Sequence, residues 1–331
     1  MPATVSVQDL IKTYDKGKVL AVDKVSFEVK AGELFGLIGA DGAGKSTIFR
    51  ILTTVLLADS GSATLAGYDV VRDYREIRNR VGYMPGKFSL YQDLTVQENL
   101  EFFATVFGTT IEANMDLIKD IYDQIKPFSN RRAGKLSGGM KQKLALCCAL
   151  IHKPEVLLLD EPTTGVDVVS RKEFWEMLKK LKAQGITIIV STPYMDEAKL
   201  CERIALIQNG RIMSVDTPGN IIRAYPEKLF AAKSDDIYKL LKDFRNHPEV
   251  DRAFAFGEFI HISLKNAERT TLNAERSTLN AERTTVSSQL DILNRIAAEN
   301  NHTGIQIKEI EPGIEDSFIL LMGRNDITAN P

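Results

Sequence analysis

The sequence predicts an α/β protein with two domains, in which a parallel sheet carrying a phosphate-binding loop is followed by a smaller α+β domain. Three observations predict this fold class. A glycine-rich loop, Gly39–Ser46, lies between a short apolar run and a helical segment. Two further apolar runs, Val156–Leu159 and Ile186–Val190, have the length and composition of buried parallel strands. After Thr217-Pro218-Gly219 a new alternation of strands and helices begins, and 331 residues are enough for two domains.

The first segment, Thr4–Lys30, alternates apolar and polar residues, as at Val25, Phe27 and Val29. A period of two is typical of strands with one buried face. The segment therefore predicts an antiparallel sheet that leads into the parallel core.

The loop Gly39–Ser46 reads Gly-Ala-Asp-Gly-Ala-Gly-Lys-Ser and fits the spacing G-x-x-x-x-G-K-[ST]. Its glycines let successive backbone N–H groups point at one centre. Lys45 can then reach the outer phosphates of a nucleotide, and Ser46 offers a hydroxyl to Mg²⁺. The run Leu34–Ile38 predicts a strand before the loop, and Thr47–Leu57 predicts a helix after it, whose N-terminal dipole favours phosphate. These flanks disfavour the alternative of a glycine turn with a chance lysine.

A second motif, Leu136–Lys143, reads Leu-Ser-Gly-Gly-Met-Lys-Gln-Lys and runs into an apolar helix, Leu144–Ile151. Ser137, Gly138 and Gly139 form a helix start built of small residues, which suits a second phosphate contact. An N-cap serine followed by two flexible glycines explains the same residues equally well.

A third motif is the apolar run Val156–Leu159, which ends in Asp160 and Glu161. At a strand end, Asp160 can hold Mg²⁺ through water, and Glu161 can take a proton from an attacking water. Adjacent acids at strand ends are common, so this motif gains its meaning from the other two.

Together and in this order, the motifs resemble those of the ATP-binding subunit of an ABC transporter, over about residues 5 to 220. Gly39–Ser46 resembles the Walker A loop, Leu136–Lys143 the ABC signature and Val156–Glu161 Walker B. Thr164-Gly165-Val166-Asp167 resembles the D-loop. The stretch from Ser191 to Ala198, Ser-Thr-Pro-Tyr-Met-Asp-Glu-Ala, is most similar to the ABC-2 exporter group, which includes drug and polysaccharide efflux systems.

The resemblance implies a fold, a P-loop NTPase of the ABC cassette type, with a RecA-like core plus antiparallel β and helical subdomains. It also implies the site. Glu161 is the implied catalytic base, and Ser46 and Asp160 are the implied Mg²⁺ ligands, the aspartate through water. Tyr14 lies where the family places an aromatic ring against adenine, although an ordinary loop tyrosine is the alternative. The implied ATP-binding residues are Tyr14, Gly39, Asp41, Gly42, Ala43, Gly44, Lys45, Ser46, Thr47, Ser137, Gly138 and Gly139.

Two positions depart from the family pattern and carry chemistry. After Val81-Gly82-Tyr83-Met84-Pro85, where the family has a Q-loop glutamine, this chain has Gly86. At the switch histidine it has Pro193, which has neither a side-chain proton nor a backbone donor. We expect nucleotide binding to be intact and hydrolysis to be slowed, or helped by groups such as Lys87 or Gln92. The equal alternative is a subgroup that works normally without either side chain.

The family sandwiches each ATP between Walker A of one domain and the signature of another, and this chain has one of each. The resemblance therefore implies a second nucleotide-binding domain. The working unit is expected to be either a slow homodimer or an asymmetric heterodimer in which this chain's signature completes a better equipped site.

The composition is that of a globular protein, with 44% apolar and 26% charged residues. The formal charge is only −2, from 42 basic and 44 acidic residues, which gives no electrostatic footprint for nucleic acid. We find no apolar run near the roughly 20 residues of a membrane span and no secretion signal. We therefore expect a cytoplasmic protein, peripheral on the cytoplasmic face of the inner membrane, with the pore supplied by separate ABC-2 type permease subunits.

The three cysteines, Cys147, Cys148 and Cys201, have no spacing that suits zinc or a disulfide framework. We expect them to be buried, reduced thiols. The four histidines are scattered and suggest no metal cluster.

Residues 88–140 are expected to form the helical subdomain, because Val96–Phe107 has apolar residues at helical spacing. Core packing explains that pattern. The resemblance adds that this subdomain meets the cytoplasmic coupling helix of the permease, with Phe88, Leu90 and Tyr91 as candidate contacts.

The second domain, 221–331, is predicted to follow the order βαββαβ and to be ferredoxin-like. Its expected elements are Leu229–Ala232, Asp235–Arg245, Val250–Phe256, Phe259–Leu264, Gln289–Glu299 and Ile305–Ile310, with a last short helix at Glu315–Leu321. A role in dimer support or regulation is as open as plain packing. Near-copies of Asn-Ala-Glu-Arg-Thr-Thr-Leu fill 266–286; each copy gives one large apolar residue where a coiled-coil seam needs two, so we expect a partly helical surface insertion.

The function predicted from these observations is ATP-driven export, in which ATP closes two nucleotide domains and hydrolysis resets them. One alternative is a soluble, non-transport ABC ATPase, which the single cassette and the lack of basic excess disfavour. The other is a catalytically impaired regulatory subunit, which Gly86 and Pro193 favour and Glu161 opposes.

Overall fold

The computed structural model describes residues 3–265 and 286–328. It divides into two compact units, of which the first runs to Ile221 and also includes the chain from Phe318 onward. The second unit is Ile222–Ser317. The sequence-based division at 220/221 placed everything after it in the second domain. The predicted heptad insertion at 266–286 lies outside the described residues, except for Val286, the first residue of a helix.

A six-stranded sheet forms the centre of the first unit, in the order β10-β9-β3-β8-β7-β6. All its neighbouring strands are parallel except β10, which pairs antiparallel with β9. The strands β3, β7 and β8 are buried along their whole length, which explains their near-continuous apolar sequence. The bounds are β3 (Leu34–Ile38), β6 (Val81–Met84), β7 (Val156–Asp160), β8 (Thr187–Thr192), β9 (Arg203–Gln208) and β10 (Arg211–Asp216).

An antiparallel sheet with the strand order β2-β1-β4-β5 forms a second layer of this unit. Its strands are β1 (Ala3–Tyr14), β2 (Val19–Lys30), β4 (Ser60–Leu65) and β5 (Tyr68–Asp69). The alternation predicted for Thr4–Lys30 is visible in β2, where Val25, Phe27 and Val29 are buried between exposed neighbours. A hydrophobic core joins these side chains to β3 and to the helix that follows it.

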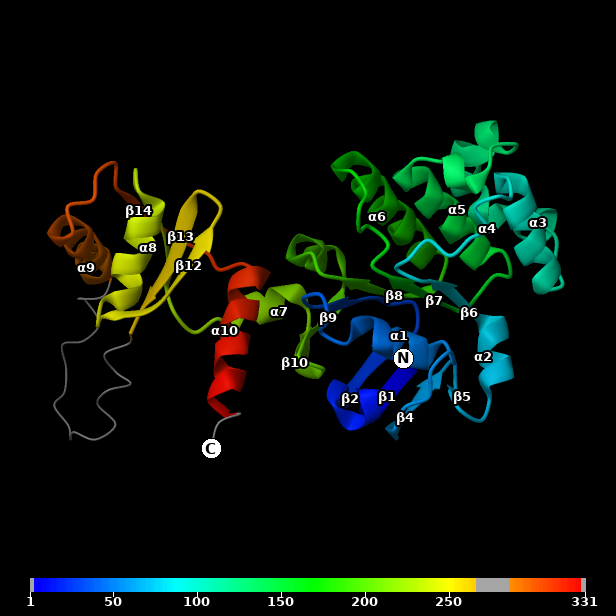
Figure 1. The fold of residues 1–331 in the computed structure, drawn as a ribbon, viewed down its shortest axis with the longest axis horizontal. Coiled ribbons are helices and arrows are strands. Elements are labelled where there is room, and N and C mark those ends of the chain that lie inside the picture. The colour runs from blue at the N-terminus through cyan, green and yellow to red at the C-terminus, as the bar shows by residue number, and fades with distance from the viewer. Residues whose placement is uncertain (1–2, 266–285, 329–331) are drawn as a thin grey trace. The chain divides into compact units, whose positions relative to one another are not determined.

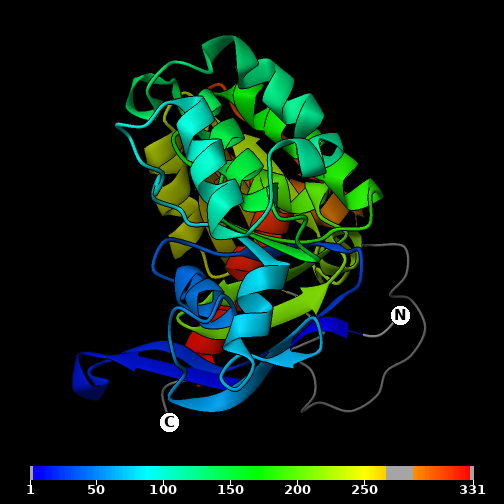
Figure 2. The ribbon, with the colours of Figure 1, turned by 90° about the vertical axis from the view of Figure 1, so that its right-hand side faces the viewer.

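Helices cover both faces of the six-stranded sheet. Figure 1 shows α3, α4, α5 and α6 on one side of it and α1 on the other, with the antiparallel sheet beyond α1, and the turned view in Figure 2 agrees. The bounds are α1 (Lys45–Leu52), α2 (Tyr74–Arg80), α3 (Val96–Val106), α4 (Met115–Ile125), α5 (Gly138–Leu150) and α6 (Val168–Ala183). Short 3₁₀ turns occupy Asp15–Gly17, Glu112–Asn114, Lys126–Phe128, Ala133–Lys135 and Met195–Leu200.

The helix α1 ends at Leu52, five residues before the predicted end at Leu57. The hydroxyl of Thr53 donates a hydrogen bond to the Phe49 carbonyl at 2.8 Å, and Thr54 has a left-handed φ of 61°. A left-handed residue cannot continue a right-handed helix. The apolar residues that follow therefore belong to a loop, which the periodicity alone did not indicate.

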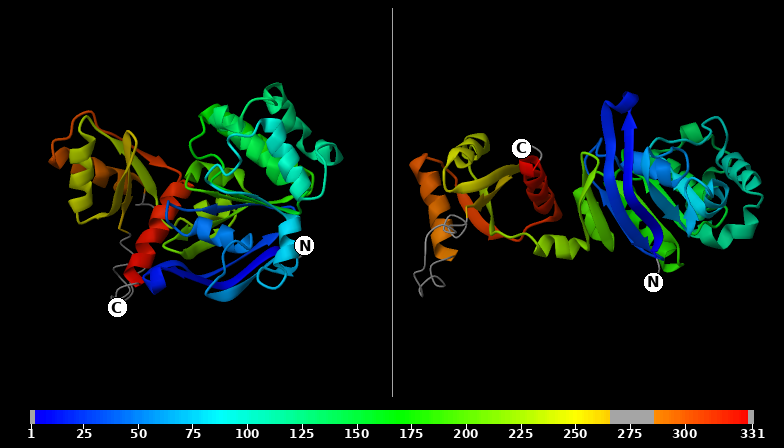
Figure 3. Two further views of the ribbon diagram at one scale, coloured as in Figure 1. Left: turned by 45° about the vertical axis from the view of Figure 1, so that its right-hand side comes forward. Right: turned by 90° about the horizontal axis from the view of Figure 1, so that it is seen from below.

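The second unit follows the element order βαββαβ, whose strands and helices can be followed by their colours in both views of Figure 3. Its four strands are antiparallel in the order β12-β13-β11-β14. Side chains of the strands and both helices share one hydrophobic core. The bounds are β11 (Leu229–Lys233), α8 (Ile237–Asn246), β12 (Val250–Phe256), β13 (Phe259–Leu264), α9 (Val286–Glu299) and β14 (Gln306–Ile310).

The two ends of this unit fall within helices, its start within α7 (Pro218–Arg223) and its end within α10 (Ile314–Thr328). The predicted break at Thr217-Pro218-Gly219 is therefore the start of a short helix, and α10 is longer than the predicted Glu315–Leu321. Among the described residues, none of the helices combines the length and apolar composition of a membrane span.

Candidate functional site

The loop Gly39–Gly44 connects β3 to α1, and two of its glycines are required by close backbone approach. A Cβ atom on Gly39 would lie 2.2 Å from the Ile207 carbonyl oxygen, and one on Gly44 would lie 2.4 Å from that of Ala21. Gly44 also has a φ of 105°, which side-chain-bearing residues rarely adopt. Gly39 and Gly44 therefore have no room for a side chain. We call the loop Gly39–Gly44 the cradle.

Lys45 begins α1 and turns back into this cradle, where it is 3% exposed. Its ammonium donates hydrogen bonds to the carbonyls of Gly39 at 2.8 Å and Ala40 at 3.0 Å. It also lies 3.1 Å from Oε1 of Glu161, which comes from the end of β7. The fold thus joins the predicted phosphate-binding cation to the predicted base, two residues far apart in the sequence.

Asp160 is the last residue of β7, Glu161 follows it directly, and both are held by one serine of the neighbouring strand. The Ser191 hydroxyl donates to Oδ1 of Asp160 at 2.6 Å and accepts from the Glu161 backbone N–H at 3.0 Å. Glu161 has a left-handed φ of 50°, and its N–H also lies 3.1 Å from the Ser191 carbonyl. Backbone strain of this kind gathers at functional sites. Sequence reasoning missed Ser191 in this role, although parallel strand ends meet at one sheet edge.

The other predicted nucleotide contacts differ in exposure. The loop residues Asp41 and Gly42 are exposed, whereas Ala43 and Thr47 are buried. Ser46, in the first turn of α1, is partly exposed. The Tyr14 hydroxyl lies 3.3 Å from Oγ1 of Thr47, so the ring at the end of β1 reaches this first turn.

The second motif lies at the start of α5, where Ser137 accepts a hydrogen bond from the Met140 N–H at 3.4 Å as the N-cap. Ser137 and Gly138 are exposed. A Cβ on Gly139 would lie 2.8 Å from Oγ of Ser170 in α6. The motif is thus packed against the start of α6 while its serine faces outward, available to a ligand outside this chain.

Gly86 lies directly beside the acidic pair. A Cβ on Gly86 would lie 3.2 Å from the Asp160 carbonyl oxygen and 3.8 Å from its Oδ2. A side chain at this position would therefore begin at the carboxylate, and glycine provides none. Gln92, considered as a substitute, instead packs against Gly134, whose N–H donates to the Gln92 carbonyl at 2.9 Å.

Two further side chains near the sheet have altered acidity. Burial, together with the negative charge of Asp160, raises the pKa of Tyr83 to about 12. Burial likewise raises the pKa of all three cysteine thiols, which are buried and free, as expected. Among the described residues, we find no group of histidine, cysteine or acidic side chains that could hold a metal ion by itself.

The arrangement fits a magnesium nucleotide. The cradle excludes side chains and presents a buried ammonium, as a triphosphate requires. The hydroxyl of Ser46 and the carboxylate of Asp160 are the hard oxygen donors that Mg²⁺ prefers.

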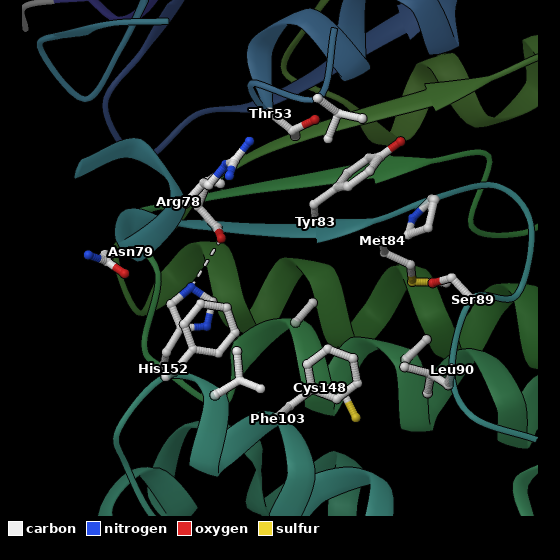
Figure 4. Close-up of a pocket in the computed structure, with 17 residues that line it drawn as sticks. Thr53, Arg78, Asn79, Tyr83, Met84, Ser89, Leu90, Phe103, Cys148 and His152 are labelled. Carbon is white, nitrogen blue, oxygen red and sulfur yellow. Dashed lines mark hydrogen bonds between the residues drawn. The ribbon is translucent and has the colours of Figure 1, made fainter. Parts of the chain in front are cut away.

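A groove of about 490 Å³ lies between the sheet and the helices α3 and α5. Figure 4 shows its lining, with Leu90 and Phe103 on one side and Tyr83 and Met84 on the other. His152 stacks on Phe107 at 3.8 Å, and its Nε2 hydrogen-bonds the Val81 carbonyl at 3.0 Å. The lining is mostly apolar, with Arg78 as its one cation and no acid. Burial lowers the pKa of His152, which favours its neutral form.

Comparison with known proteins gives one consistent family. A model of the ABC transporter family matches residues 22–164. The probable multidrug ABC transporter ATP-binding protein YbhF of Escherichia coli strain K12 is 35% identical over 333 residues, 99% of this chain and 54% of that protein. This chain thus spans about half the length of the first curated relatives it matches. Nod factor export ATP-binding protein I of Rhizobium sp. strain N33 is 33% identical over 315 residues, 93% of this chain and 94% of that protein.

Solved structures of ATP-binding cassettes are similar over about two thirds of this chain. An ATP-binding subunit of an ABC transporter superposes with a TM-score of 0.61 at 27% identity, covering 67% of this chain and 93% of that one. A dimeric ATP-binding cassette in a post-hydrolysis state, bound to ADP and Pi, gives 0.58 at 26% identity, covering 64% and 98%.

Proposed function

This chain belongs to the ATP-binding proteins of ABC transporters, and from that premise we propose that it binds and hydrolyses MgATP to drive export through separate membrane permease subunits. The observation that carries the proposal is the meeting of Lys45, Glu161 and Asp160 at one edge of the sheet. The motifs lie in distant parts of the sequence. The phosphate loop supplies Lys45, the end of β7 supplies Asp160 and Glu161, and the signature supplies the exposed Ser137. The multidrug and Nod factor export names of the relatives support the assignment to export.

We assign the triphosphate to the cradle, where backbone N–H groups and Lys45 hold it and the dipole of α1 favours its charge. Tyr14 packs against the adenine ring. Ser46 and Asp160 hold Mg²⁺, the aspartate through water, and the ion neutralises charge on the outer phosphates. Glu161 accepts a proton from the attacking water.

We propose that a second cassette completes the site, because Ser137 and Gly138 are exposed and therefore open to a ligand held by another chain. Ser137 and Gly139 then grip the γ-phosphate of the partner's ATP. The partner is a second copy or a different cassette. The dimeric structure of a similar cassette supports the two-cassette arrangement.

We assign the groove beside Leu90 and Phe103 to a cytoplasmic segment of the permease. Its apolar lining and single cation suit a helical segment with apolar anchors and one acid placed opposite Arg78. Tyr91 is exposed and packs edge-on against Phe102 at 4.9 Å, so it extends this surface. Docking here places the chain on the cytoplasmic face of the inner membrane.

The test combines turnover and co-purification. The purified chain is expected to hydrolyse MgATP, and Glu161→Gln is expected to abolish turnover while nucleotide affinity stays within about threefold of the native value. A tagged native chain should co-purify a multi-span permease, and Leu90→Asp should lose it. A chain that binds no MgATP, or turnover that survives Glu161→Gln, contradicts the proposal.

A second candidate is a regulatory subunit that binds ATP and hydrolyses it too slowly to drive transport. Gly86 beside Asp160 and Pro193 at the switch favour this candidate. Single-turnover hydrolysis by the complex with its permease separates the two, because a regulatory subunit leaves its own ATP intact on the timescale of transport.

A further inference from the structure

The start of α6 is held on one side by the signature. A Cβ on Gly139 would lie 2.8 Å from Oγ of Ser170, and one on Gly138 would lie 3.6 Å from the Gly165 carbonyl oxygen. Asp167 caps the helix by accepting from the N–H groups of Val169 and Ser170 at 3.1 and 3.0 Å. The first turn of α6 is therefore capped and in direct contact with the signature helix.

On its other side, α6 presents Arg171 to a buried carboxylate. The guanidinium donates two hydrogen bonds to Oε1 of Glu197, at 3.1 Å from Nε and 2.9 Å from Nη2. Glu197 is 2% exposed and the Arg171 side chain is 21% exposed, so the carboxylate is shielded from water while the guanidinium lies at the edge of the buried region. Arg171 also stacks over the Tyr194 ring at 4.2 Å and lies 3.4 Å from Asp196. Charge-assisted pairs of this geometry hold their partners in fixed positions.

The second oxygen of Glu197 continues the path to the phosphate loop. The Thr192 hydroxyl donates to Oε2 of Glu197 at 2.6 Å and accepts from the Tyr194 N–H at 3.0 Å. The Thr192 carbonyl accepts from the N–H of Gly39, the first residue of the loop, at 3.3 Å. Three successive links, Arg171 to Glu197, Glu197 to Thr192 and Thr192 to Gly39, thus connect α6 to the cradle through the switch segment.

We propose that Arg171, acting through Glu197 and Thr192, is a positioning residue that couples nucleotide binding at Gly39 to the position of α6. The inference rests on the proposed function and deepens it by naming how the two ends of the cassette communicate. Pro193 has no N–H and no polar side chain, so the switch segment is held by Thr192 and Tyr194 instead. Because the signature rests on α6, movement of α6 reaches the surface that grips the other cassette's nucleotide.

The structure supplies its own reporter for the test. Trp175, the one tryptophan in the sequence, lies on α6 a single turn after Arg171 and is 2% exposed. Its fluorescence reports the packing of α6. The experiment uses the purified full chain and the magnesium complex of a non-hydrolysable ATP analogue. Calorimetry measures the affinity for this complex, and a fluorimeter records the change in tryptophan fluorescence when the same complex is added. Single-turnover hydrolysis of MgATP is the second readout.

The native chain is expected to show a fluorescence change on binding. Thr192→Val keeps the side-chain shape and removes the hydroxyl. It should bind the analogue within about threefold of the native affinity, lose most of the fluorescence change and slow single-turnover hydrolysis by about tenfold or more. Thr192→Ser should restore both signals. Lys172→Met, an exposed neighbour on α6, should behave like the native chain.

A second route breaks the path at its other end. Removing Arg171 alone would leave a lone buried carboxylate and risk unfolding. The double variant Arg171→Met/Glu197→Gln removes both charges together and should lose the same signal, with no further loss when Thr192→Val is added.

The outcomes separate the two claims. If the native chain binds no magnesium nucleotide, the proposed function fails and the coupling fails with it. If the native chain binds but shows no fluorescence change, or if folded Thr192→Val keeps the native signal and rate, the coupling alone is overturned. If affinity falls as steeply as rate, Thr192 shapes the binding site itself and the relay is likewise overturned.

Discussion

A loop position can require glycine because its φ is left-handed or because neighbouring backbone leaves no room for a Cβ atom. Three glycines of the phosphate loop allow these two reasons to be tested separately. Gly42 has a left-handed φ of 78° and no atom within 4 Å of a would-be Cβ. Gly39 lacks a left-handed φ, but its Cβ would lie 2.2 Å from a backbone oxygen. Gly44 combines a φ of 105° with a backbone oxygen at 2.4 Å. Alanine at Gly42 therefore tests the left-handed conformation alone, alanine at Gly39 tests the close contact alone, and alanine at Gly44 tests both.

The structure sets the order of the effects. Alanine at Gly42 incurs only the left-handed penalty, about 1–2 kcal/mol. Alanine at Gly39 forces a backbone shift, and overpacking of this kind costs about 1–3 kcal/mol. Alanine at Gly44 incurs both, about 2–5 kcal/mol in total. If the loop moves to relieve the clash, the cradle opens and nucleotide affinity falls by about tenfold for each 1.4 kcal/mol.

The assay is the free energy of unfolding in urea, with MgATP affinity measured on the same samples by calorimetry. We expect the loss of stability to rise in the order Gly42→Ala, Gly39→Ala, Gly44→Ala, and the two clashing variants to lose most affinity. Equal stability and affinity of Gly44→Ala and Gly42→Ala would refute the close-approach reasoning.

Three further predictions concern other parts of the first unit. Gly86→Gln supplies a side chain beside Asp160 and should raise single-turnover hydrolysis about tenfold; an unchanged rate would show that the missing glutamine does not slow the enzyme. The three buried thiols have raised pKa values, so they should resist a thiol reagent at pH 8 until urea unfolds the chain. Because the folded state keeps thiol protons that the unfolded state loses, stability should fall as pH rises above about 8.5, by roughly 1.4 kcal/mol per pH unit for each thiol; labelling at the exposed-cysteine rate would contradict both statements. Asn99 is fully buried and bonds the backbone of the loop before α3 four times, so Asn99→Ala should destabilise the unit by about 2–4 kcal/mol in urea unfolding; the exposed Glu101→Ala is its control and should change stability by less than about 0.5 kcal/mol.

The elements that sequence reasoning located well are those whose signal is local. The strand β13 has the predicted bounds Phe259–Leu264. Apolar and polar residues alternate along most of this segment, and Gly257 turns the chain just before it. Element ends were less accurate where a single backbone angle decides them, as at Thr54 after α1. The assignments of Tyr14, Ser137 and the Mg²⁺ ligands remain predictions that the experiments above address.

By itself, the sequence determined the motifs that are contiguous: the glycine-rich loop ahead of Lys45, the capped start of α5 at Ser137, and the acid pair at the carboxyl end of β7. Each depends on neighbours within one turn or strand, so the residue order contains the information. Only the tertiary structure decided which distant groups meet. The register of β7, β8 and β3 brings Glu161 to Lys45 and Ser191 to Asp160. The packing of α6 against the switch pairs Arg171 with Glu197. Such contacts depend on the order of strands and the path of the chain between them, which short-range spacing does not encode.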